Sequence, residues 1–549
     1  MGRFFPFQPA PDEYPNHLAA PRPEPLRLPA ARGLLLILVL LCLAPRMAMF
    51  FRIPGVCPDG VVYIHAAEAI EAGDFRVGLR DMSLNTYPVI LMLLHRTGLD
   101  WHGAAGLWGV AVSSLVVLPL WGWARRQFDD RVALAACLLY AVHPKFIEWT
   151  PEIMRDPTFW LFFMAAIYWL WRAVTEVRYS YFIAAGAAIT LASLTRIEGL
   201  FLLIPLVLWT FWRFRSLQTD RKKLLRGAVL CVVAFPTLLV LVNLAVLCGH
   251  SGWAALRLSP LTRAWAGLES AFGGDAETAA GALEKTMTIG QMIWVFIPTL
   301  TRGLSPIFAL LMFGGIWGWR RVWSRRDHQP LFYVALVVMC GVWVQLWYDH
   351  QICPRYALPI VLMASPFAAL GLLGLVGRVS RLAERRHWGP RRQATLVTIV
   401  VAVLFSVCLI DAMTGSTAYF RSRRTALDVG RWVRRAFPVP AKLVGPVGVT
   451  PIIGHYAQCG DCQTFRWDAD DATILEMTKQ SRPDVVVLQA AKQLTPERCS
   501  SLARRLKPLG LEPAHPDVAT AEDCDIMVFV RADQIDHVKQ HAENPVSQR

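Results

Sequence analysis

Charged residues are scarce in this chain of 549 residues, because Asp, Glu, Lys and Arg together make up only 18% of it. A soluble protein of this length carries about 25% charged residues. Hydrophobic residues make up 54%, and the mean hydropathy is +0.38. These values exclude an ordinary soluble protein of several domains. They predict a membrane domain, since apolar runs recur from Gly33 to Met413 and then stop.

Several motifs that would indicate other classes of protein are missing. The chain has no internal repeat, and its tail has no Gly-rich phosphate loop. Cys459-Gly-Asp-Cys462 has no second cysteine pair of the same spacing, which a structural zinc site would need. Cys459 and Cys462 are therefore predicted to form either a local disulfide bridge or half of a metal site, and both possibilities stay open.

Basic residues exceed acidic ones and give a formal net charge of +15. They gather in short clusters between apolar runs, as Arg125 and Arg126 do, which is typical of cytoplasmic loops. The chain shows no basic groove motif, so nucleic acid is not an expected partner. With a cytoplasmic N-terminus, every second loop is basic. An odd number of crossings of the cytoplasmic (inner) membrane then places the tail on the periplasmic side.

Apolar windows divide the chain into three expected parts. A helix needs about 20 largely apolar residues to cross a bilayer, and this criterion gives about eleven crossings. We expect a disordered cytoplasmic N-terminus (1–32), a transmembrane domain (33–413) and a small outer α/β domain (414–549). The expected spans are Gly33–Phe51, Gly103–Trp123, Val132–Trp149, Thr158–Ala173, Tyr181–Leu194, Leu200–Trp212, Gly227–Cys248, Ser305–Trp319, Leu331–Trp347, Ala357–Val376 and Ala394–Ala412.

Two apolar stretches are too short or too interrupted to be spans. Ser83–Leu99 and Gln291–Leu300 each contain a proline, and we expect them to be interfacial helices on the outer face. They lie in or beside two long outer loops, Arg52–His102 and Gly249–Gln291. Long loops held by a rigid scaffold are places where a functional site can be built.

The tail changes in composition and predicts strands that alternate with helices. Asp484–Leu488, Asp525–Val530 and Lys442–Val449 have the β-branched and apolar character of strands, and Ala426–Ala436 has a helical pattern. This alternation favours a small α/β domain.

Asp59 is the first candidate for chemistry. Ionisable residues at the edge of a membrane are functional candidates, because burying them is costly. Asp59 follows the first span and begins the segment Asp59–Phe75, which is predicted to be a short helix that ends at Gly73. The alternative is a structural role, because Asp also suits the N-terminal cap of a helix.

A second candidate region is His143–Pro157, which holds three acids and two cations at the junction of two spans. Glu152 and Asp156 are four residues apart, so on a helix they would share a face. Two prolines interrupt the segment and favour an irregular backbone that lines a wet cavity. The alternative is an internal network of salt bridges.

Two further arginines lie on the same side of the membrane. Arg196 and Glu198 occupy a very short outer turn, and Arg355 with Tyr356 begins a later span. A guanidinium group suits phosphate, because its planar fork donates two parallel hydrogen bonds. The alternatives are an interface anchor for Arg196 and Glu198, and non-specific contact with lipid phosphate for Arg355.

Four motifs in this order resemble those of the GT-C superfamily of membrane glycosyltransferases. The similarity is to family 39, the branch of the protein O-mannosyltransferases and aminoarabinose transferases, and it extends over most of Gly33–Ala412 and the tail. The motifs are Asp59 with Tyr63 and Gly73-Asp74, the segment Thr86–Pro88, the turn Thr195–Gly199, and the segment Arg355–Pro359.

The resemblance implies a GT-C fold and a transferase that moves a hexose or pentose from a polyprenyl-phosphate donor to a hydroxyl group. It implies that Asp59 is the base that accepts the hydroxyl proton while the anomeric centre inverts. Arg196 or Arg355 would then stabilise the phosphate leaving group. Many relatives carry Asp-Glu at the first motif, whereas Gly60 follows Asp59 here. Glu152 or Asp156 is the candidate for that second acid.

The resemblance and the residue patterns together define the candidate site and partners. The expected partners are the lipid bilayer, the polyprenyl-phosphate sugar and an acceptor that is a lipid, a glycan or a protein. Some GT-C relatives hold a divalent metal with acidic residues, so a metal cofactor stays open and no metal ligand is predicted. The candidates are Asp59, Glu152 and Asp156 for catalysis; Arg155, Arg196, Arg355 and Tyr356 for the donor phosphate; and Tyr63, Tyr87, His143 and Glu198 for the acceptor or the cavity.

Two other functions fit parts of the pattern. A transporter or lipid flippase would also have many spans and buried charges, although the chain shows no paired halves with broken helices. A non-catalytic assembly protein would use the tail as a binding module. Asp59 on a long first outer loop favours the enzyme over both.

Overall fold

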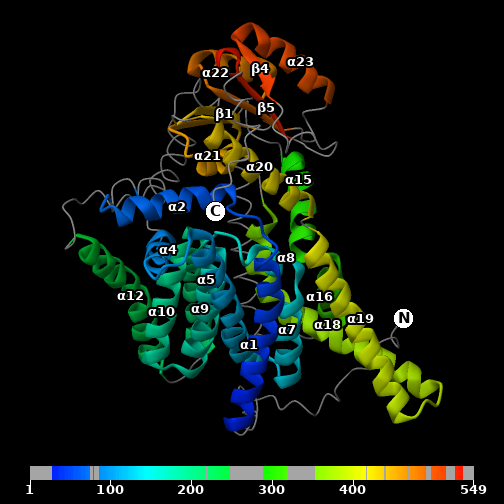
Figure 1. Ribbon diagram of the computed structural model, residues 1–549. Coiled ribbons are helices and arrows are strands. Elements are labelled where there is room, and N and C mark those ends of the chain that lie inside the picture. The colour runs from blue at the N-terminus through cyan, green and yellow to red at the C-terminus, as the bar shows by residue number, and fades with distance from the viewer. Residues whose placement is uncertain are drawn as a thin grey trace. The chain divides into compact units, whose positions relative to one another are not determined.

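Figure 1 shows the computed structural model of the chain. The chain divides into two compact units, of which the first comprises Met1–Phe51, Ala66–Leu99 and Gly103–Met413. The second comprises Arg52–His65, Asp100–His102 and Thr414–Arg549, so the segment that carries Asp59 belongs to the same unit as the tail. The residues described are 28–74, 78, 86–216, 220–247, 289–318, 353–415, 417–437, 440–466, 469–489, 496–514 and 526–535.

The first unit is helical, because an apolar segment in a bilayer must satisfy its backbone hydrogen bonds internally. Its neighbouring helices pack side by side, as α9 does with α10 and α16 with α18 (Figure 1). The helices are α1 (Leu28–Phe50), α2 (Pro58–Glu71, which begins in the second unit), α4 (Tyr87–His95), α5 (Trp101–Leu115), α6 (Val117–Gln127), α7 (Asp130–Val142), α8 (Pro144–Trp149), α9 (Asp156–Glu176), α10 (Tyr179–Thr195), η1 (Ile197–Leu202), α11 (Leu203–Ser216), α12 (Arg221–Leu247), α15 (Ile289–Leu304), α16 (Pro306–Gly318), η5 (Pro354–Ala357), α18 (Leu358–Arg385) and α19 (Pro390–Thr414).

Among the described residues, five helical stretches are long and apolar enough to cross a membrane, or six if the bent pair of α15 and α16 forms one span. Other expected spans are short or interrupted: Val132–Trp149 becomes α7 and α8, and Leu200–Trp212 becomes η1 and α11. The expected span Leu331–Trp347 and most of the expected loop Gly249–Gln291 lie outside the described residues. The five stretches are Arg32–Phe50, Trp101–Gln127, Asp156–Glu176, Pro354–Arg385 and Pro390–Ala436.

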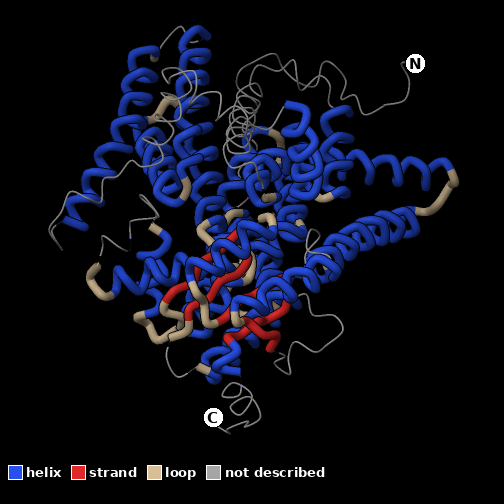
Figure 2. Tube along the Cα trace, turned by 90° about the horizontal axis from the view of Figure 1, so that it is seen from above, coloured by secondary structure: helices blue, strands red, loops and turns tan. Residues whose placement is uncertain are grey.

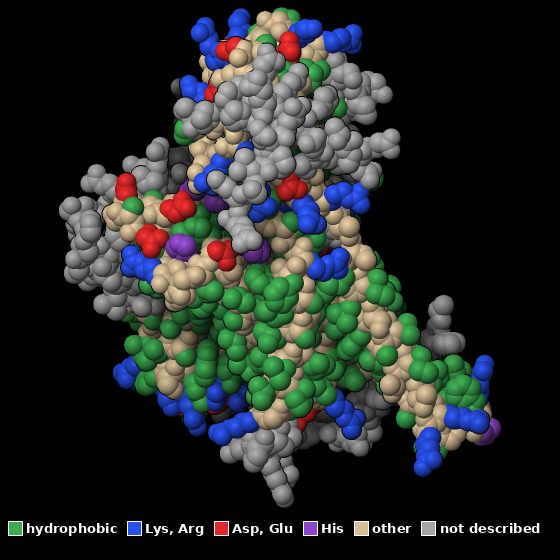
Figure 3. Space-filling model, viewed as in Figure 1, with side chains coloured by type: hydrophobic (Ala, Val, Ile, Leu, Met, Phe, Trp, Pro, Cys, Tyr) green, Lys and Arg blue, Asp and Glu red, His purple; other side chains and the backbone are tan. Residues whose placement is uncertain are grey.

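The outer surface of the first unit is apolar. Large hydrophobic side chains are exposed on its helices, including Leu36 of α1, Ile183 of α10 and Leu310 of α16. On the face in Figure 3, hydrophobic side chains cover the helices of this unit, and Lys and Arg gather at their lower ends. An apolar surface of this extent is stable against lipid and not against water. The chain is therefore an integral membrane protein.

Two helix breaks meet in this unit. Pro144 and Pro306 each occupy a first turn, where proline is tolerated because its missing N–H would have no partner there. Helix α7 ends before His143, and α15 meets α16 at an angle of 93°. The His143 Nε2 atom lies 3.1 Å from the carbonyl oxygen of Leu304. His143 therefore connects the two breaks and is a buried structural contact.

A buried arginine stabilises the end of α7. Arg46 of α1 is fully buried, and its guanidinium donates to the carbonyl oxygens of Ala141 at 3.2 Å and Tyr140 at 3.3 Å. These carbonyls belong to the last turn of α7, where carbonyl groups have no N–H four residues ahead in the helix, and the His143 N–H also donates to Tyr140 at 3.4 Å. A cation at the C-terminal end of a helix also interacts favourably with the helix dipole.

The second unit contains a five-stranded sheet of order β2-β1-β3-β5-β4. Strand β1 runs parallel to β2 and β3, whereas β5 is antiparallel to β3 and β4. Figure 2 shows these strands gathered together, with helices beside them. The strands are β1 (Lys442–Pro446), β2 (Asp461–Phe465), β3 (Val485–Gln489), β4 (Leu511–Ala514) and β5 (Ile526–Arg531), and the helices are α20 (Thr417–Ala436), α21 (Thr450–Ala457), α22 (Asp471–Ser481) and α23 (Pro496–Leu506).

Helices cover both faces of this sheet. Val485 and Val487 of β3 share one apolar core with residues of α20 and α21. Val486 and Leu488, which point to the other face, share a second core with residues of α22 and α23. Burial on both faces makes Val485–Leu488 apolar throughout, which is why the sequence predicts β3 so clearly.

Cys459 lies between α21 and β2, Cys462 lies in β2, and both are free thiols. The hydrogen bond between their sulfur atoms raises the pKa of Cys459 and lowers the pKa of Cys462.

Candidate functional site

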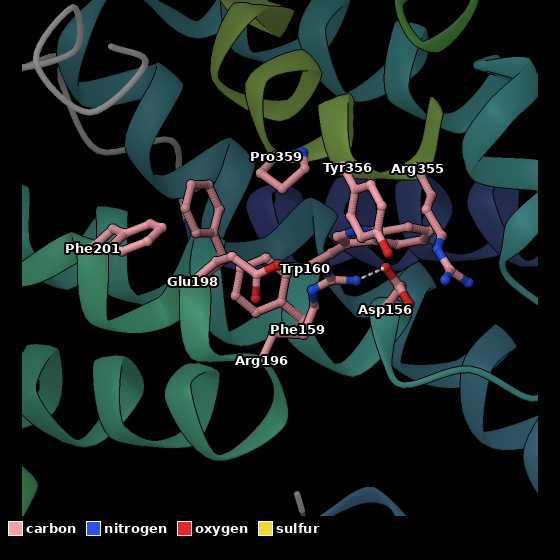
Figure 4. A pocket seen from close by; sticks show the side chains of 10 residues that line it. Asp156, Phe159, Trp160, Arg196, Glu198, Phe201, Arg355, Tyr356 and Pro359 are labelled. Atoms are coloured by element: carbon pink, nitrogen blue, oxygen red, sulfur yellow. Dashed lines mark hydrogen bonds and ion pairs between the residues drawn. The ribbon is translucent and has the colours of Figure 1, made fainter. Parts of the chain in front are cut away.

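A pocket in the first unit gathers charged and aromatic side chains from three places in the chain (Figure 4). They come from the first part of α9, from Arg196 with η1, and from η5 with the start of α18. An apolar wall with a few convergent charges is the usual form of a ligand site. The lining residues are Asp156, Phe159, Trp160, Phe163, Arg196, Glu198, Phe201, Arg355, Tyr356 and Pro359.

Local sequence brings these side chains to the ends of their helices. Pro157 favours the first turn of α9 and places Asp156 at its start. Helix α10 ends at Thr195, and Arg196 leaves it with extended dihedral angles (φ −145°, ψ 134°). The chain then folds back tightly, because a Cβ on Gly199 would lie 2.5 Å from the backbone nitrogen of Ser193. Glycine at this position is therefore required for the turn that presents Arg196.

Arg196 is the centre of the pocket. Its guanidinium donates to the Asp156 carboxylate at 2.6 Å and to the Glu198 carboxylate at 2.5 Å. Its side chain is only 6% exposed, and its charge is shared between two carboxylates. Arg196 therefore binds protein carboxylates and fixes the end of α10 to the start of α9.

The charge of Arg196 also governs the protonation of Glu198. Burial raises the pKa of the Glu198 carboxyl, but the adjacent Arg196 guanidinium outweighs this effect and lowers the pKa to about 2. The more distant Arg155 lowers the pKa further by its charge. Glu198 is consequently ionised at neutral pH and is a poor general base.

Tyr356 lies near two guanidinium groups. The Arg196 guanidinium carbon lies 4.8 Å from the centre of the Tyr356 ring, and that of Arg355 lies 5.3 Å from it. Figure 4 shows the Tyr356 ring beside the ion pair of Arg196 and Asp156. A cation over an aromatic face is attracted to it without being neutralised.

Arg355 differs from Arg196 in its surroundings. It is half-buried, its Nη1 donates to the Met154 sulfur at 3.0 Å, and its guanidinium lies 6.0 Å from the Trp149 ring. Met154 and Trp149 therefore help to hold a second guanidinium at the wall of this pocket.

The other two acids of the segment His143–Pro157 do not line the pocket. Glu152 is buried in the irregular stretch between α8 and α9, as the two prolines predict, so it does not share a helix face with Asp156. Lys145 forms an ion pair with Glu148 at 2.5 Å. This pair and the pair of Arg196 with Asp156 match the salt-bridge alternative for the segment, and Asp156 carries out that structural role at the pocket wall.

Tyr87 is close in the fold to the turn at Arg196, whereas Asp59 and Tyr63 belong to the second unit. The Thr86 N–H donates to the Leu194 carbonyl at 2.9 Å, which places the start of α4 beside the end of α10. Asp59 lies in the first turn of α2 and is half-buried, and Tyr63 is buried in the same helix.

Sequence reasoning missed the aromatic wall of the pocket. Phe159, Trp160 and Phe163 look like ordinary membrane-facing residues, and only their position one turn after Asp156 was a usable signal. The described residues include no group of three or more His, Cys, Asp or Glu side chains that is placed to hold a metal. In the pocket itself, two acids are already paired with Arg196.

A family model described as dolichyl-phosphate-mannose-protein mannosyltransferase matches residues 91–240. This range includes the helices that contribute Asp156, Arg196 and Glu198 to the pocket. No curated protein matches the chain in sequence.

Two solved structures are similar to the chain over most of its length. The archaeal oligosaccharyltransferase AglB from Archaeoglobus fulgidus, in complex with an inhibitory peptide and a dolichol-phosphate, is 12% identical, with a TM-score of 0.55. The match covers 86% of this chain and 70% of that one. ArnT from Cupriavidus metallidurans, bound to undecaprenyl phosphate, is 14% identical, with a TM-score of 0.53 and coverage of 91% and 98%. At these identities the likeness is one of fold, and it confirms the fold class that the sequence predicts.

Proposed function

We propose that this chain, which has the fold of the GT-C membrane glycosyltransferases, transfers a sugar from a polyprenyl-phosphate donor to a hydroxyl acceptor. The observation that carries this proposal is a pocket of the membrane unit that combines two guanidinium groups with an aromatic wall. Arg196 and Arg355 both line it and both lie near the Tyr356 ring, and Phe159, Trp160 and Phe163 line the same pocket. Guanidinium groups beside apolar side chains in a membrane domain suit a lipid phosphate.

The proposed reaction is a single displacement. The acceptor oxygen forms a bond to the anomeric carbon, and the bond from that carbon to the phosphate oxygen breaks. The acceptor proton passes to the Asp59 carboxylate, and the polyprenyl phosphate leaves with one additional negative charge. One displacement inverts the configuration of the anomeric centre. Arg355, with Arg155 at the edge of the site, stabilises the charge that develops on the leaving group.

The other candidate residues receive supporting roles in this proposal. Arg196, Asp156 and Glu198 fix the pocket wall, and the Tyr356 ring attracts both guanidinium groups. Glu152 is the candidate second acid, because Asp156 already accepts from Arg196. Tyr63 and Tyr87 are assigned to the acceptor side, and His143 supports the cavity from the helix breaks.

The orientation of the chain in the cytoplasmic membrane is part of the same proposal. The basic clusters of alternate loops favour a cytoplasmic N-terminus and a tail on the outer side. ArnT is described as bound to undecaprenyl phosphate, and AglB as bound to a dolichol-phosphate. By analogy, the donor here is a sugar on a polyprenyl phosphate, and its acceptor is a hydroxyl group of a lipid, a glycan or a protein.

The test is sugar transfer from radiolabelled polyprenyl-phosphate sugars, with membranes that contain equal amounts of wild type or Asp59→Asn. We expect transfer in wild type and a loss on the order of 100- to 10,000-fold in Asp59→Asn, because general base catalysis contributes that much. Glu68→Gln removes an exposed carboxylate from the same helix and serves as the matched control. Full transfer by Asp59→Asn would remove Asp59 as the base. Absence of transfer from every donor, together with movement of the lipid across the membrane, would favour a flippase.

A further inference from the structure

We propose that the C-terminal domain positions Asp59 for the reaction, through Arg423 and Tyr456. These two residues hold the backbone of Gly55 and Val56, which leads directly into the helix that carries Asp59. Both contacts lie within the second unit of the structure. The inference rests on the proposed function, since Asp59 is the base only in that reaction, but the contacts themselves are independent of it.

Arg423 provides the first contact. It lies on α20, its side chain is 1% exposed, and its Nε donates to the Val56 carbonyl at 2.9 Å. Its Nη2 donates to the carbonyl of Gly55, the adjacent residue. Two neighbouring carbonyls match the planar fork of a guanidinium, which a lysine does not reproduce. A buried arginine that binds two successive peptide groups fixes both the position and the orientation of that backbone.

Tyr456 of α21 provides the second contact. The Val56 N–H donates to its hydroxyl oxygen at 3.1 Å, so the N–H and the carbonyl of Val56 are both bonded to the C-terminal domain. Gly55 has φ +63°, and a Cβ there would clash with the Tyr456 hydroxyl and lie 2.8 Å from the Leu427 Cδ1 atom. Only glycine fits this close approach, which is further evidence that the segment is docked.

The docked segment continues into α2 without a flexible connection. Cys57 is fully buried, its carbonyl accepts from the Val61 N–H at 3.1 Å, and its sulfur accepts from the Gly60 N–H at 3.3 Å. Asp59 lies between these bonded residues, three positions after Val56. Its backbone is therefore fixed on both sides.

The two residues that hold the segment lie on helices that pack closely against each other. Helices α20 and α21 approach so closely at Gly430 that a Cβ there would lie 2.8 Å from the Ile453 carbonyl oxygen. Arg423 and Tyr456 consequently keep a fixed separation. A displacement of about 1 Å at a reacting group costs on the order of 100-fold in rate, so this support matters for a general base.

The experiment compares Arg423→Met, Arg423→Lys and Tyr456→Phe with the control Arg424→Met, which removes an exposed arginine one position along the same helix. Two quantities are measured in purified full-length protein. One is kcat and KM for sugar transfer. The other is the rate at which a thiol reagent labels Cys57, identified by peptide mass spectrometry. Cys57 is buried in the docked segment, so its labelling reports release of that segment without any need for activity.

We expect Arg423→Met to lower kcat on the order of 100-fold with KM for the donor unchanged, and to make Cys57 reactive. Arg423→Lys restores part of kcat, since the cation is kept and one hydrogen bond is regained. Tyr456→Phe removes a single hydroxyl with little risk to folding and lowers kcat about tenfold. Wild-type kcat and wild-type Cys57 protection in both Arg423→Met and Tyr456→Phe would overturn the proposal. A third outcome is that Cys57 becomes reactive in the variants while the wild-type protein shows no sugar transfer. That result would support the docking contact and reject the proposed function.

Discussion

Arg196 and Asp156 form a buried ion pair with 2.6 Å between nitrogen and oxygen, although 40 positions separate them in the sequence. The pair joins Arg196, the residue that directly follows α10, to Asp156, the first residue of α9. Removal of one partner leaves an uncompensated buried charge, which costs about 3–5 kcal/mol. Arg196→Met should therefore destabilise the protein by about that amount, as measured by thermal unfolding in detergent. Arg196→Met combined with Asp156→Asn and Glu198→Gln should lose less stability than Arg196→Met alone; an additive loss would contradict the pairing.

Arg355 is expected to contribute to binding of the donor phosphate and not to the stability of the fold. Arg355→Lys keeps the charge but loses the planar fork, so kcat/KM for the polyprenyl-phosphate sugar should fall about 10- to 100-fold. Donor titrations with wild type, Arg355→Lys and the exposed-residue control Arg302→Met measure this effect. Unchanged donor kinetics in Arg355→Lys would exclude Arg355 from the phosphate site.

The ion pair of Glu198 predicts how stability depends on pH. Its pKa in the folded protein is about 2, below the ordinary value of 4.5, so the pair stabilises the folded state above the unfolded pKa. This contribution is lost as the pH falls from 4.5 toward 2. The difference in unfolding temperature between wild type and Glu198→Gln should be constant at neutral pH and should narrow in that acidic window. A difference that already narrows near pH 7 would show that the carboxylate is not held by Arg196.

Two glycines let α16 and α18 touch. A Cβ on Gly371 would clash with the Leu311 carbonyl, and a Cβ on Gly315 would clash with the Phe367 carbonyl. Small residues at such crossings allow backbones to approach in membrane proteins. Gly371→Ala should destabilise the protein by about 1–3 kcal/mol and should also weaken donor binding, because α18 follows η5 and Arg355. Gly374→Ala is the matched control, since a Cβ there would meet no atom within 4 Å. Equal stability of the two variants would exclude the close crossing.

The elements predicted best are those whose pattern is set within a few residues. The strand-like run Asp484–Leu488 corresponds to β3, and Asp525–Val530 corresponds to β5. Both are buried on two faces over most of their length, so Val485–Leu488 and Ile526–Val530 are continuous apolar runs. Strand β2 (Asp461–Phe465) was not predicted, because most of its side chains are exposed or half-exposed and it lacks an apolar run. Strand β4 was missed for the related reason that it is short and contains a proline.

Some helix breaks could also be predicted from the sequence, whereas the residues that contact these breaks could not. Pro151 and Pro157 predict the irregular stretch around Glu152, because proline restricts both itself and the residue before it. The contact of His143 with Leu304 follows from no local pattern, since 161 positions separate the two residues. Arg46 lies inside the expected span Gly33–Phe51, and only the fold shows that it stabilises the end of α7.

The sequence by itself determined that this protein lies in a membrane, which residues are ionisable at its edge, and where its buried strands run. These properties depend on hydropathy, on proline and on alternation, which act over a few residues. Tertiary structure alone decided that Arg196 is paired with Asp156 and Glu198, and that Arg423 and Tyr456 hold the segment before Asp59. The role of an arginine depends on the groups that surround it after folding, and those groups come from distant parts of the chain.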